Sequence, residues 1–282
     1  MTTSVRRGRT LRSRLLEFIR DATGRLTAAW RILSTAQTRL LDALARIRPG
    51  RGGTRAVRTA TAMFNRSVAD FDRAVATFAH RWAATDLPLI YREGALTTLD
   101  HVDRPHRMWS WTQRHQGALT TLSTQYFADL MGRLQEGLRR ARAFLRAALD
   151  AVRMRFGRFE VATLDRAALL RDHPLGTVIY ANDARHPVDA WARAAISWQA
   201  VTTANTAAAR TALDELGCHW MEVRDGHDCG WAGHSDEDKA DGTLRTVQDA
   251  LAHPTAHANC IREFLPRPDI IDRPDFAFGS LA

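Results

Sequence analysis

Cysteine, lysine and long apolar runs are all scarce in this chain of 282 residues. Only three cysteines occur, all of them C-terminal, so the chain is not expected to form a disulfide framework, and a reducing compartment is favoured. No stretch reaches the roughly 18 apolar residues that a membrane-crossing helix requires, so no transmembrane helix and no membrane partner are expected. The opening residues MTTSVRRGRTLRSRLLEF contain neither a continuous apolar segment nor a small-residue cleavage site, so no secretory signal is expected.

Several catalytic motifs are also missing from the sequence. It contains no P-loop, no G-x-G-x-x-G after a strand, no G-x-S-x-G elbow and no H-E-x-x-H. Glu222 follows His219 by three residues, but side chains three apart on a strand face opposite sides, so the two are not expected to act as an acid–base pair. The H-x-E and C-x-x-C signatures of zinc deaminases are absent as well. An enzyme is therefore not expected, although a zinc-binding nuclease of the HNH type stays an alternative because His257 and Asn259 occur together.

The charge that is present is mostly arginine. The formal net charge is +9, and Lys239 is the only lysine. The first 60 residues hold fourteen arginines against three acidic residues, and the stretch 139–158 is again rich in arginine. A basic half of this kind can contact the phosphates of a nucleic acid or an acidic protein surface. The alternative is that these arginines simply line the solvated faces of long helices.

The N-terminal half has apolar residues at helical spacing, which predicts helices over residues 4–48, 54–84 and 106–155. Gly24 could divide the first of these helices into two. The third segment is either one helix or two joined near Gly132 to Gly137. As a single helix of about 45 residues it would be about 68 Å long. That length exceeds a compact domain and suggests either an elongated helical hairpin or a partner that covers the helix.

Shorter elements follow from turn and capping signals. Thr85-Asp86-Leu87-Pro88 would cap a short helix that ends near Leu99. A change of character at Gly157 is followed by a series of short elements. These are a helix at 164–171, strands at 177–180 and 219–223, a helix from Val188 to about Leu216 that Pro187 opens and Gly217 caps, a helix at 244–251 and a closing strand at 261–265.

These elements together predict a mainly α fold in two parts. Residues 1–160 would form an elongated, basic, partner-binding helical region. Residues 161–282 would form a small α+β module that carries a zinc-like loop of cysteines and histidines.

The loop contains two short-range pairs of metal-ligand residues. Cys229 and His234 form a Cys-x4-His pair, and His257 and Cys260 form a His-x2-Cys pair. Two such pairs, each spanning one tight turn and separated by a polar loop, suit a closed tetrahedral zinc site that supplies folding energy. Four protein ligands favour a structural metal over a catalytic one, which usually keeps an open position.

Other assignments of this loop stay open. Its rival ligands are two further histidines and a third thiol, namely His227, His253 and Cys218. In a metal-free alternative, Cys229 is a small buried residue and the histidines are solvated. A catalytic metal is the remaining alternative.

The same stretch carries a resemblance to a known family. A strand ending in V-x-D-G-x-D-C, a glycine-bearing loop and then H-x-N-C-x-R resemble the C-terminal module of phage minor head proteins, the Mu F-like and related minor capsid proteins. Cys229 matches the first cysteine of the family, and His257, Asn259 and Cys260 match the later motif. His234 stands where a second ligand is expected but at a different spacing, and alanine replaces proline at position 258. The resemblance covers residues 165 to 268.

The resemblance implies a structural protein of a tailed-phage head. Such a protein would bind the portal or the major capsid protein and act in head assembly or in DNA packaging or ejection. It would reside in the virion, at the capsid interior or portal vertex, after assembly in the host cytoplasm, and its N-terminal arginines could contact packaged DNA. The alternatives are a metal-dependent nuclease or toxin carried on a phage-type protein, and a DNA-binding protein that acts through the basic helical half.

Overall fold

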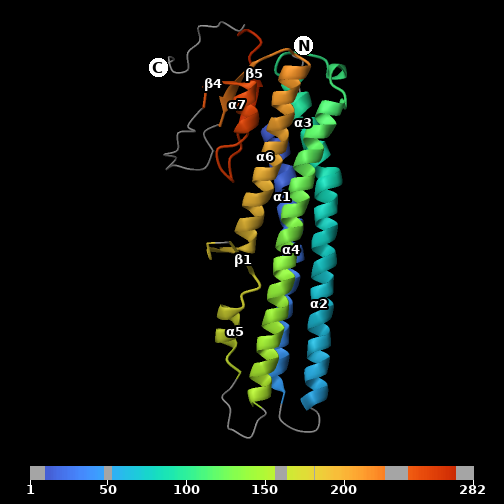
Figure 1. Ribbon diagram of the computed structural model, residues 1–282, viewed down its shortest axis with the longest axis vertical. Helices are drawn as coiled ribbons and strands as arrows, with labels where there is room; N and C mark the ends of the chain where they lie inside the picture. The colour runs from blue at the N-terminus through green and yellow to red at the C-terminus, as the bar shows by residue number, and fades with distance from the viewer. Residues whose placement is uncertain (1–9, 48–52, 156–163, 181, 226–240, 271–282) are drawn as a thin grey trace, which may run out of the picture. The chain divides into compact units, whose positions relative to one another are not determined.

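The computed structural model describes residues 10–47, 53–155, 164–180, 182–225 and 241–270. These residues are mainly helical, with a small strand-containing region toward the C-terminus (Figure 1), which confirms the expected fold class at this level. The chain forms two compact units. The sheet unit comprises residues 1–19, 85–123 and 194–282, and the helical unit comprises residues 20–84 and 124–193. Each unit therefore takes segments from both sides of the boundary expected at residue 160.

The long helices follow the predicted apolar stripes. They are α1 (Leu11–Arg46), α2 (Gly53–Arg81), α3 (Leu87–Asp100) and α4 (Gln113–Arg155), with a short 3-10 turn at His106–Met108 before α4. These bounds show whether the first and third predicted helices are interrupted. The α1 helix runs unbroken past Gly24, which lies exposed with open space around its Cα, so the predicted division there is wrong. The α4 helix is one helix rather than two.

The predicted cap at residues 85–88 is also wrong. Residues Trp82–Asp86 form a π-helical segment that continues α2 into α3. Asp86 has helical backbone angles, with φ −72° and ψ −45°, and its side chain makes no cap hydrogen bond. The chain therefore changes its helical register at this point, as single π turns do, without leaving the helix.

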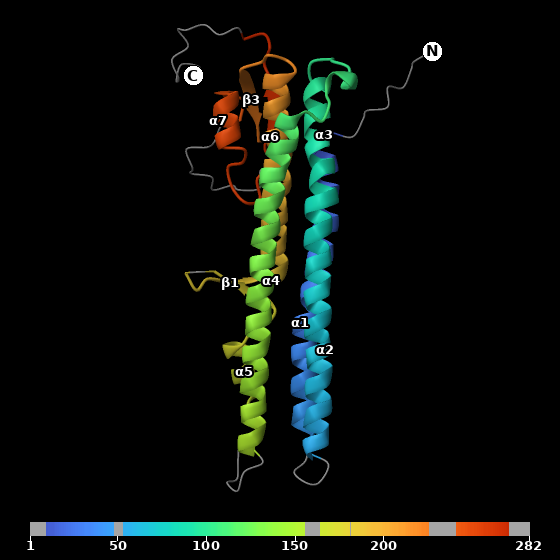
Figure 2. The same cartoon turned by 45° about the vertical axis from the view of Figure 1, so that its right-hand side comes forward.

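Aromatic residues form the core of the helical unit, where α1, α2 and α4 run side by side in two views (Figures 1 and 2). The ring centroids of Trp30 and Phe71 lie 5.1 Å apart, and those of Phe64 and Phe144 lie 5.6 Å apart. Trp191 adds a further ring at 5.4 Å from Trp30. Offset and edge-to-face pairs of this kind stabilise a core beyond their buried area.

A short helix and a hairpin complete the helical unit. They are α5 (Arg166–Asp172), β1 (Thr177–Ile179) and β2 (Arg185–Pro187), with β1 and β2 antiparallel. The β2 strand does not follow from the sequence pattern, and Pro187 is its last residue. The next helix begins directly after Pro187, at Val188, as expected. Gln37 of α1 holds the preceding segment, because its amide nitrogen donates to His173 O at 2.6 Å. Arg140 of α4 likewise donates to Thr177 O at 2.6 Å.

The sheet unit contains the small antiparallel sheet of order β4-β3-β5. The elements of this region are α6 (Val188–Asp214), β3 (Trp220–Arg224), β4 (Leu244–Thr246), α7 (Val247–Ala252) and β5 (Glu263–Pro266). Small residues of α6, such as Ala208 and Ala212, pack against Met221, Val223 and Phe264 of the sheet. The expected helix at 244–251 is shorter than predicted, because its first three residues pair with β3.

Two glycines fix how α6 is held. Gly217, at φ +59°, ends the helix in the left-handed conformation, and the N–H of Cys218 donates to Ala212 O at 2.8 Å, which confirms the predicted C-cap. Gly94 lies where α3 meets α6, and a Cβ atom there would come within 2.2 Å of Ala204 O. The two helix backbones therefore approach closely at Gly94.

None of the helices in the described ranges combines the length and apolarity needed to cross a membrane.

Candidate metal centre

The loop that carries Cys229 and His234 leaves and re-enters the sheet at a closed base. The N–H of Val223 donates to Thr243 O at 2.9 Å, and the N–H of Gly242 donates to Val223 O at 2.8 Å. Two residues after Val223, the N–H of Asp225 donates to a carboxylate oxygen of Asp241 at 2.9 Å. Gly242 has φ +77°, a backbone conformation that other residues rarely adopt. The strand pairing is therefore complete on either side of residues 226–240.

A buried ion pair lies directly at this base. Arg262 donates from Nε to Asp225 Oδ1 at 2.7 Å and from Nη2 to Asp225 Oδ2 at 3.0 Å. Both residues are buried, and Arg262 is 1 % exposed. A two-point contact between guanidinium and carboxylate is among the stronger hydrogen-bonded pairs, and leaving either charge alone in the interior would be costly.

Asn205 joins α6 to the same region. Its buried amide nitrogen donates to Pro254 O at 2.7 Å and to Arg262 O at 2.9 Å. The backbone on both sides of the turn at 257–260 is thereby held from the side of α6. This anchoring fixes the turn at 257–260 relative to the helix.

His257 and Cys260 lie on one tight turn, as their spacing predicts. The N–H of Cys260 donates to His257 O at 2.9 Å. Cys260 is fully buried, and its Sγ lies 4.0 Å from Asp225 Oδ1. The half-buried His257 accepts a hydrogen bond at Nδ1 from the N–H of Asn259 at 3.2 Å. A thiol and an imidazole thus occupy one turn beside the residue that opens the loop.

The other predicted ligands and their rivals are distributed differently. Cys229 and His234, with the rival His227, lie outside the described residues. Cys218 is buried in the α6–sheet core and donates from Sγ to Trp220 O at 3.0 Å. His253 is exposed and bonds through Nδ1 to Asp249 Oδ1 at 3.0 Å. Within the described ranges no three potential ligands gather around one point, so neither Cys218 nor His253 completes a site with His257 and Cys260.

The described half of the predicted site fits zinc in its donor chemistry and its chain geometry. Zinc binds a thiolate, and a thiolate at Cys260 would face the carboxylate of Asp225. Arg262 neutralises that carboxylate, which removes the main electrostatic obstacle to a charged sulfur there. At His257, ligation through Nδ1 would replace the hydrogen bond from Asn259. Ligation through Nε2 would require moving the ring proton to Nδ1.

Glu222 and His219, the pair that could serve a nuclease reaction, do not form a reacting site. Glu222 accepts from Arg267 at 2.9 Å and lies 3.6 Å from Arg224, so its carboxylate belongs to an ion-pair cluster on the sheet. His219 is exposed and precedes β3. The pair therefore has the character of a solvated sheet surface and not of a reacting site.

A second polar cluster, which the sequence did not indicate, lies in the sheet unit. Tyr91 O–H bonds to His115 Nδ1 at 2.9 Å, and His115 Nε2 bonds to Glu215 Oε1 at 2.9 Å. Tyr91 and His115 are fully buried, and burial raises the pKa of Tyr91 well above its usual value. The imidazole of His115 thus lies between the hydroxyl of Tyr91 and the carboxylate of Glu215. This relay joins α3, α4 and the end of α6, and its burial makes it a structural connection.

Comparisons of the chain with protein-family models, with curated proteins and with solved structures found no match.

Proposed function

We propose that this chain is a structural component of a tailed-phage head, a minor capsid protein associated with the portal or the capsid wall. The observation that supports the proposal is the meeting of the two halves of the family-like motif. Asp225 of the V-x-D-G half and Arg262 of the H-x-N-C-x-R half form one buried ion pair. The residues that carry the resemblance thus act together as one folded unit, as a shared module would require.

The remaining structure suits an assembly role. The helices α1, α2 and α4 contain 36, 29 and 43 residues, and they present long polar faces on which other proteins can dock. The polar residues at the loop base are engaged in holding chain segments together. A protein that positions a shell component needs such surfaces and anchors more than it needs a reactive cleft.

The proposal extends to a structural zinc ion in the C-terminal module. Cys229, His234, His257 and Cys260 would hold it, and the ion would tie the loop at 226–240 to the turn at 257–260. Bound there, zinc would supply folding free energy to a loop with few apolar residues. Asp225 and Arg262 would keep the charge beside the Cys260 sulfur balanced.

The head role is tested on intact particles. Particles released from the source strain are purified on a density gradient, washed in high salt and probed with an antibody against the purified protein. We expect the protein to co-sediment with DNA-filled particles and to resist added protease. Its absence from fractions that contain the major capsid protein would contradict the proposal.

The zinc site is tested separately on the purified chain. We expect about one zinc ion per chain by elemental mass spectrometry, and a lower unfolding temperature in the presence of a chelator. Cys260→Ser should lose the metal, whereas Cys218→Ser should keep it because that thiol bonds to Trp220 O. A metal-free protein with unchanged stability in chelator would remove the site and leave the head role standing.

A further inference from the structure

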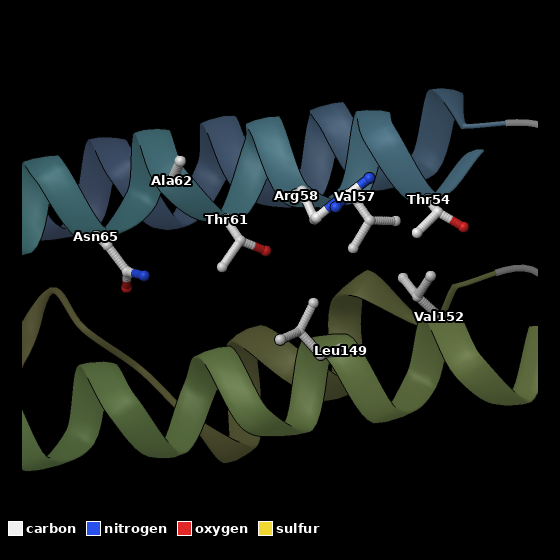
Figure 3. Close-up of a pocket in the computed structure, with 8 residues that line it drawn as sticks. All are labelled: Thr54, Val57, Arg58, Thr61, Ala62, Asn65, Leu149 and Val152. Carbon is white, nitrogen blue, oxygen red and sulfur yellow. The ribbon is translucent and has the colours of Figure 1, made fainter. Parts of the chain in front are cut away.

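A groove lies between α2 and α4 within the helical unit (Figure 3). Its volume is about 500 Å³. Figure 3 shows Thr54, Val57, Thr61 and Asn65 of α2 pointing toward α4, with Leu149 and Val152 pointing back across the gap. Eight residues line the groove: Thr54, Val57, Arg58, Thr61, Ala62, Asn65, Leu149 and Val152.

The walls and floor of this groove differ in character. Val152 is buried, and Val57 and Leu149 are half-buried, so an apolar strip runs along the bottom. The α2 wall carries short side chains at Thr61 and Ala62, which allow another backbone to come close. Two parallel ridges with an apolar strip between them are the surface on which a further helix packs.

Arginines occur on both helices at helical spacing from the groove residues, and we call these two rows the rims of the groove. On α2, Arg58 lines the groove itself, and Arg55 and Arg66 lie seven residues before and four after Ala62, which places them on its side of the helix. On α4, Arg142 and Arg146 lie seven and three residues before Leu149. All five are exposed, and no ion pair joins any of them to a carboxylate in the described part of the chain. The acidic residue on this stretch of α4 is Asp150.

We infer that this groove is a docking site for an acidic amphipathic helix of a partner protein. The strip from Thr54 to Asn65 covers twelve residues, about 17 Å or three helical turns. A helix of that length would place apolar side chains on Val57, Leu149 and Val152. Its glutamates and aspartates would then lie beside the five arginines. Charge complementarity of this kind speeds association and fixes orientation.

The groove favours a protein partner over a nucleic acid. Phosphates would use the arginines but would leave the apolar strip exposed to water. None of the eight lining residues is aromatic, so the groove offers no platform on which bases could stack. A helix uses both the strip and the rims.

The docking site rests on the proposed function in one respect: if the chain is a head protein, another protein of the phage head would supply the acidic helix. Binding measured on the purified chain tests the groove alone. The purified protein can therefore fail to bind the helix although it is found in particles. It can also bind the helix although it is absent from particles, so the two hypotheses are tested independently.

The experiment measures the fluorescence anisotropy of a labelled peptide of about 14 residues. The peptide carries leucines at i, i+3, i+4 and i+7 and glutamates on its other face, and the full-length protein is titrated into it. A second peptide with lysines in place of the glutamates, and a DNA duplex of about 20 base pairs, serve as competing probes. We expect the acidic peptide to bind, with an affinity that falls as salt is added, and the lysine peptide to bind at least about tenfold more weakly.

Two groove variants and one control locate the binding. Ala62→Trp fills the groove from an exposed position, and Arg58→Glu with Arg146→Glu reverses the charge of both rims. Each should weaken the binding of the acidic peptide by about tenfold or more. Arg39→Glu, at an exposed position of α1, should change the affinity by less than about twofold. Helical content measured by circular dichroism confirms that the variants are folded.

The outcomes separate clearly. Weakening by both groove variants, with the control unchanged, supports the inference. Failure of the acidic peptide to bind, or binding that is indifferent to Ala62→Trp, overturns it. Duplex binding that the arginine reversal abolishes and Ala62→Trp leaves intact, in the absence of peptide binding, would identify a phosphate-binding surface and would also overturn it.

Discussion

Asp225 and Arg262 stand 37 residues apart in the sequence, and each oxygen of the Asp225 carboxylate accepts one hydrogen bond from the Arg262 guanidinium. The pair is buried, and it lies where β3 ends and where the turn bearing His257 and Cys260 leads toward β5. The contact therefore controls the position of both strand ends. It also controls the charge next to the Cys260 thiol, which lies 4.0 Å from the same carboxylate.

The ion pair should dominate the local stability. Arg262→Ala leaves a buried carboxylate unpaired, and we expect it to lower the free energy of unfolding by about 3–5 kcal/mol. Arg267→Ala is a matched control, because Arg267 pairs with Glu222 and Asp269 but is partly exposed, so a loss of no more than about 1 kcal/mol is expected. Urea denaturation followed by circular dichroism measures both. Equal losses in the two variants would show that the buried pair has no special weight.

The close contact between α3 and α6 gives a second prediction. Gly94→Ala would place a methyl group 2.2 Å from the backbone oxygen of Ala204. Because the clash is with backbone, no side-chain rotation can relieve it. We expect a loss of about 1–3 kcal/mol or more as the helices separate. Gly24→Ala makes the same chemical change in the exposed interior of α1 and should stabilise the protein by about 0.5–1 kcal/mol. Thermal unfolding compares the two, and a shift of the same sign in both would contradict the contact.

The buried relay of Tyr91, His115 and Glu215 gives a third prediction. Tyr91→Phe removes the hydroxyl that bonds to His115 Nδ1 and leaves that nitrogen unsatisfied in the interior. We expect a loss of about 1–3 kcal/mol. Tyr180→Phe, at an exposed position, should change stability by less than about 0.5 kcal/mol. If Tyr91→Phe proved as mild as Tyr180→Phe in chemical denaturation, the hydroxyl would not be the bond that holds His115.

The histidine at the end of α3 gives a prediction about pH. His101 Nε2 lies 3.5 Å from Glu263 Oε1. Burial lowers the pKa of His101 below its usual 6.5, while Glu263 and Asp100 act in the opposite direction and Arg224 acts in the same direction. The unfolded chain therefore binds this proton more readily than the folded one. The stability that a neutral His101 contributes is present above pH 6.5 and is lost as pH falls through the lower folded pKa.

The measurement compares the free energy of unfolding of the original protein and of His101→Gln at pH values near 7.5 and near 5. The variant lacks the titrating ring, so its stability should decline less over this interval. His219→Gln, at an exposed position, should keep the full decline. An unchanged pH dependence in His101→Gln would show that the ring titrates equally in both states.

The long helices of the fold are predictable from the regular spacing of apolar residues. The stripe containing Leu26, Leu33 and Leu40 predicted α1, and these residues are buried. Gly217 predicts the end of a helix because glycine suits the left-handed conformation, which this residue adopts. Local patterns of this kind are visible in sequence because neighbours along one helix face meet the same environment.

The features that were missed depend on contacts between distant residues. The three residues of β2 are all exposed, so no alternation marks them as a strand. The π turn at Trp82–Asp86 resembles a capping sequence, and only the packing on either side decides between them. The partnership of Asp225 with Arg262 has no periodic signal at all. Of the predicted zinc ligands, the turn of His257 and Cys260 followed from spacing, whereas the environment of the thiol did not.

The closed base of the connection between β3 and β4 has a consequence for how such a protein can diversify. The N–H of Val223 donates to Thr243 O and the N–H of Gly242 donates to Val223 O, so the two strand ends are held together. Doubling the length of a loop whose ends are already joined costs only about 0.6 kcal/mol in chain entropy. Insertions and deletions in this segment should therefore leave the stability of the sheet beneath it nearly unchanged.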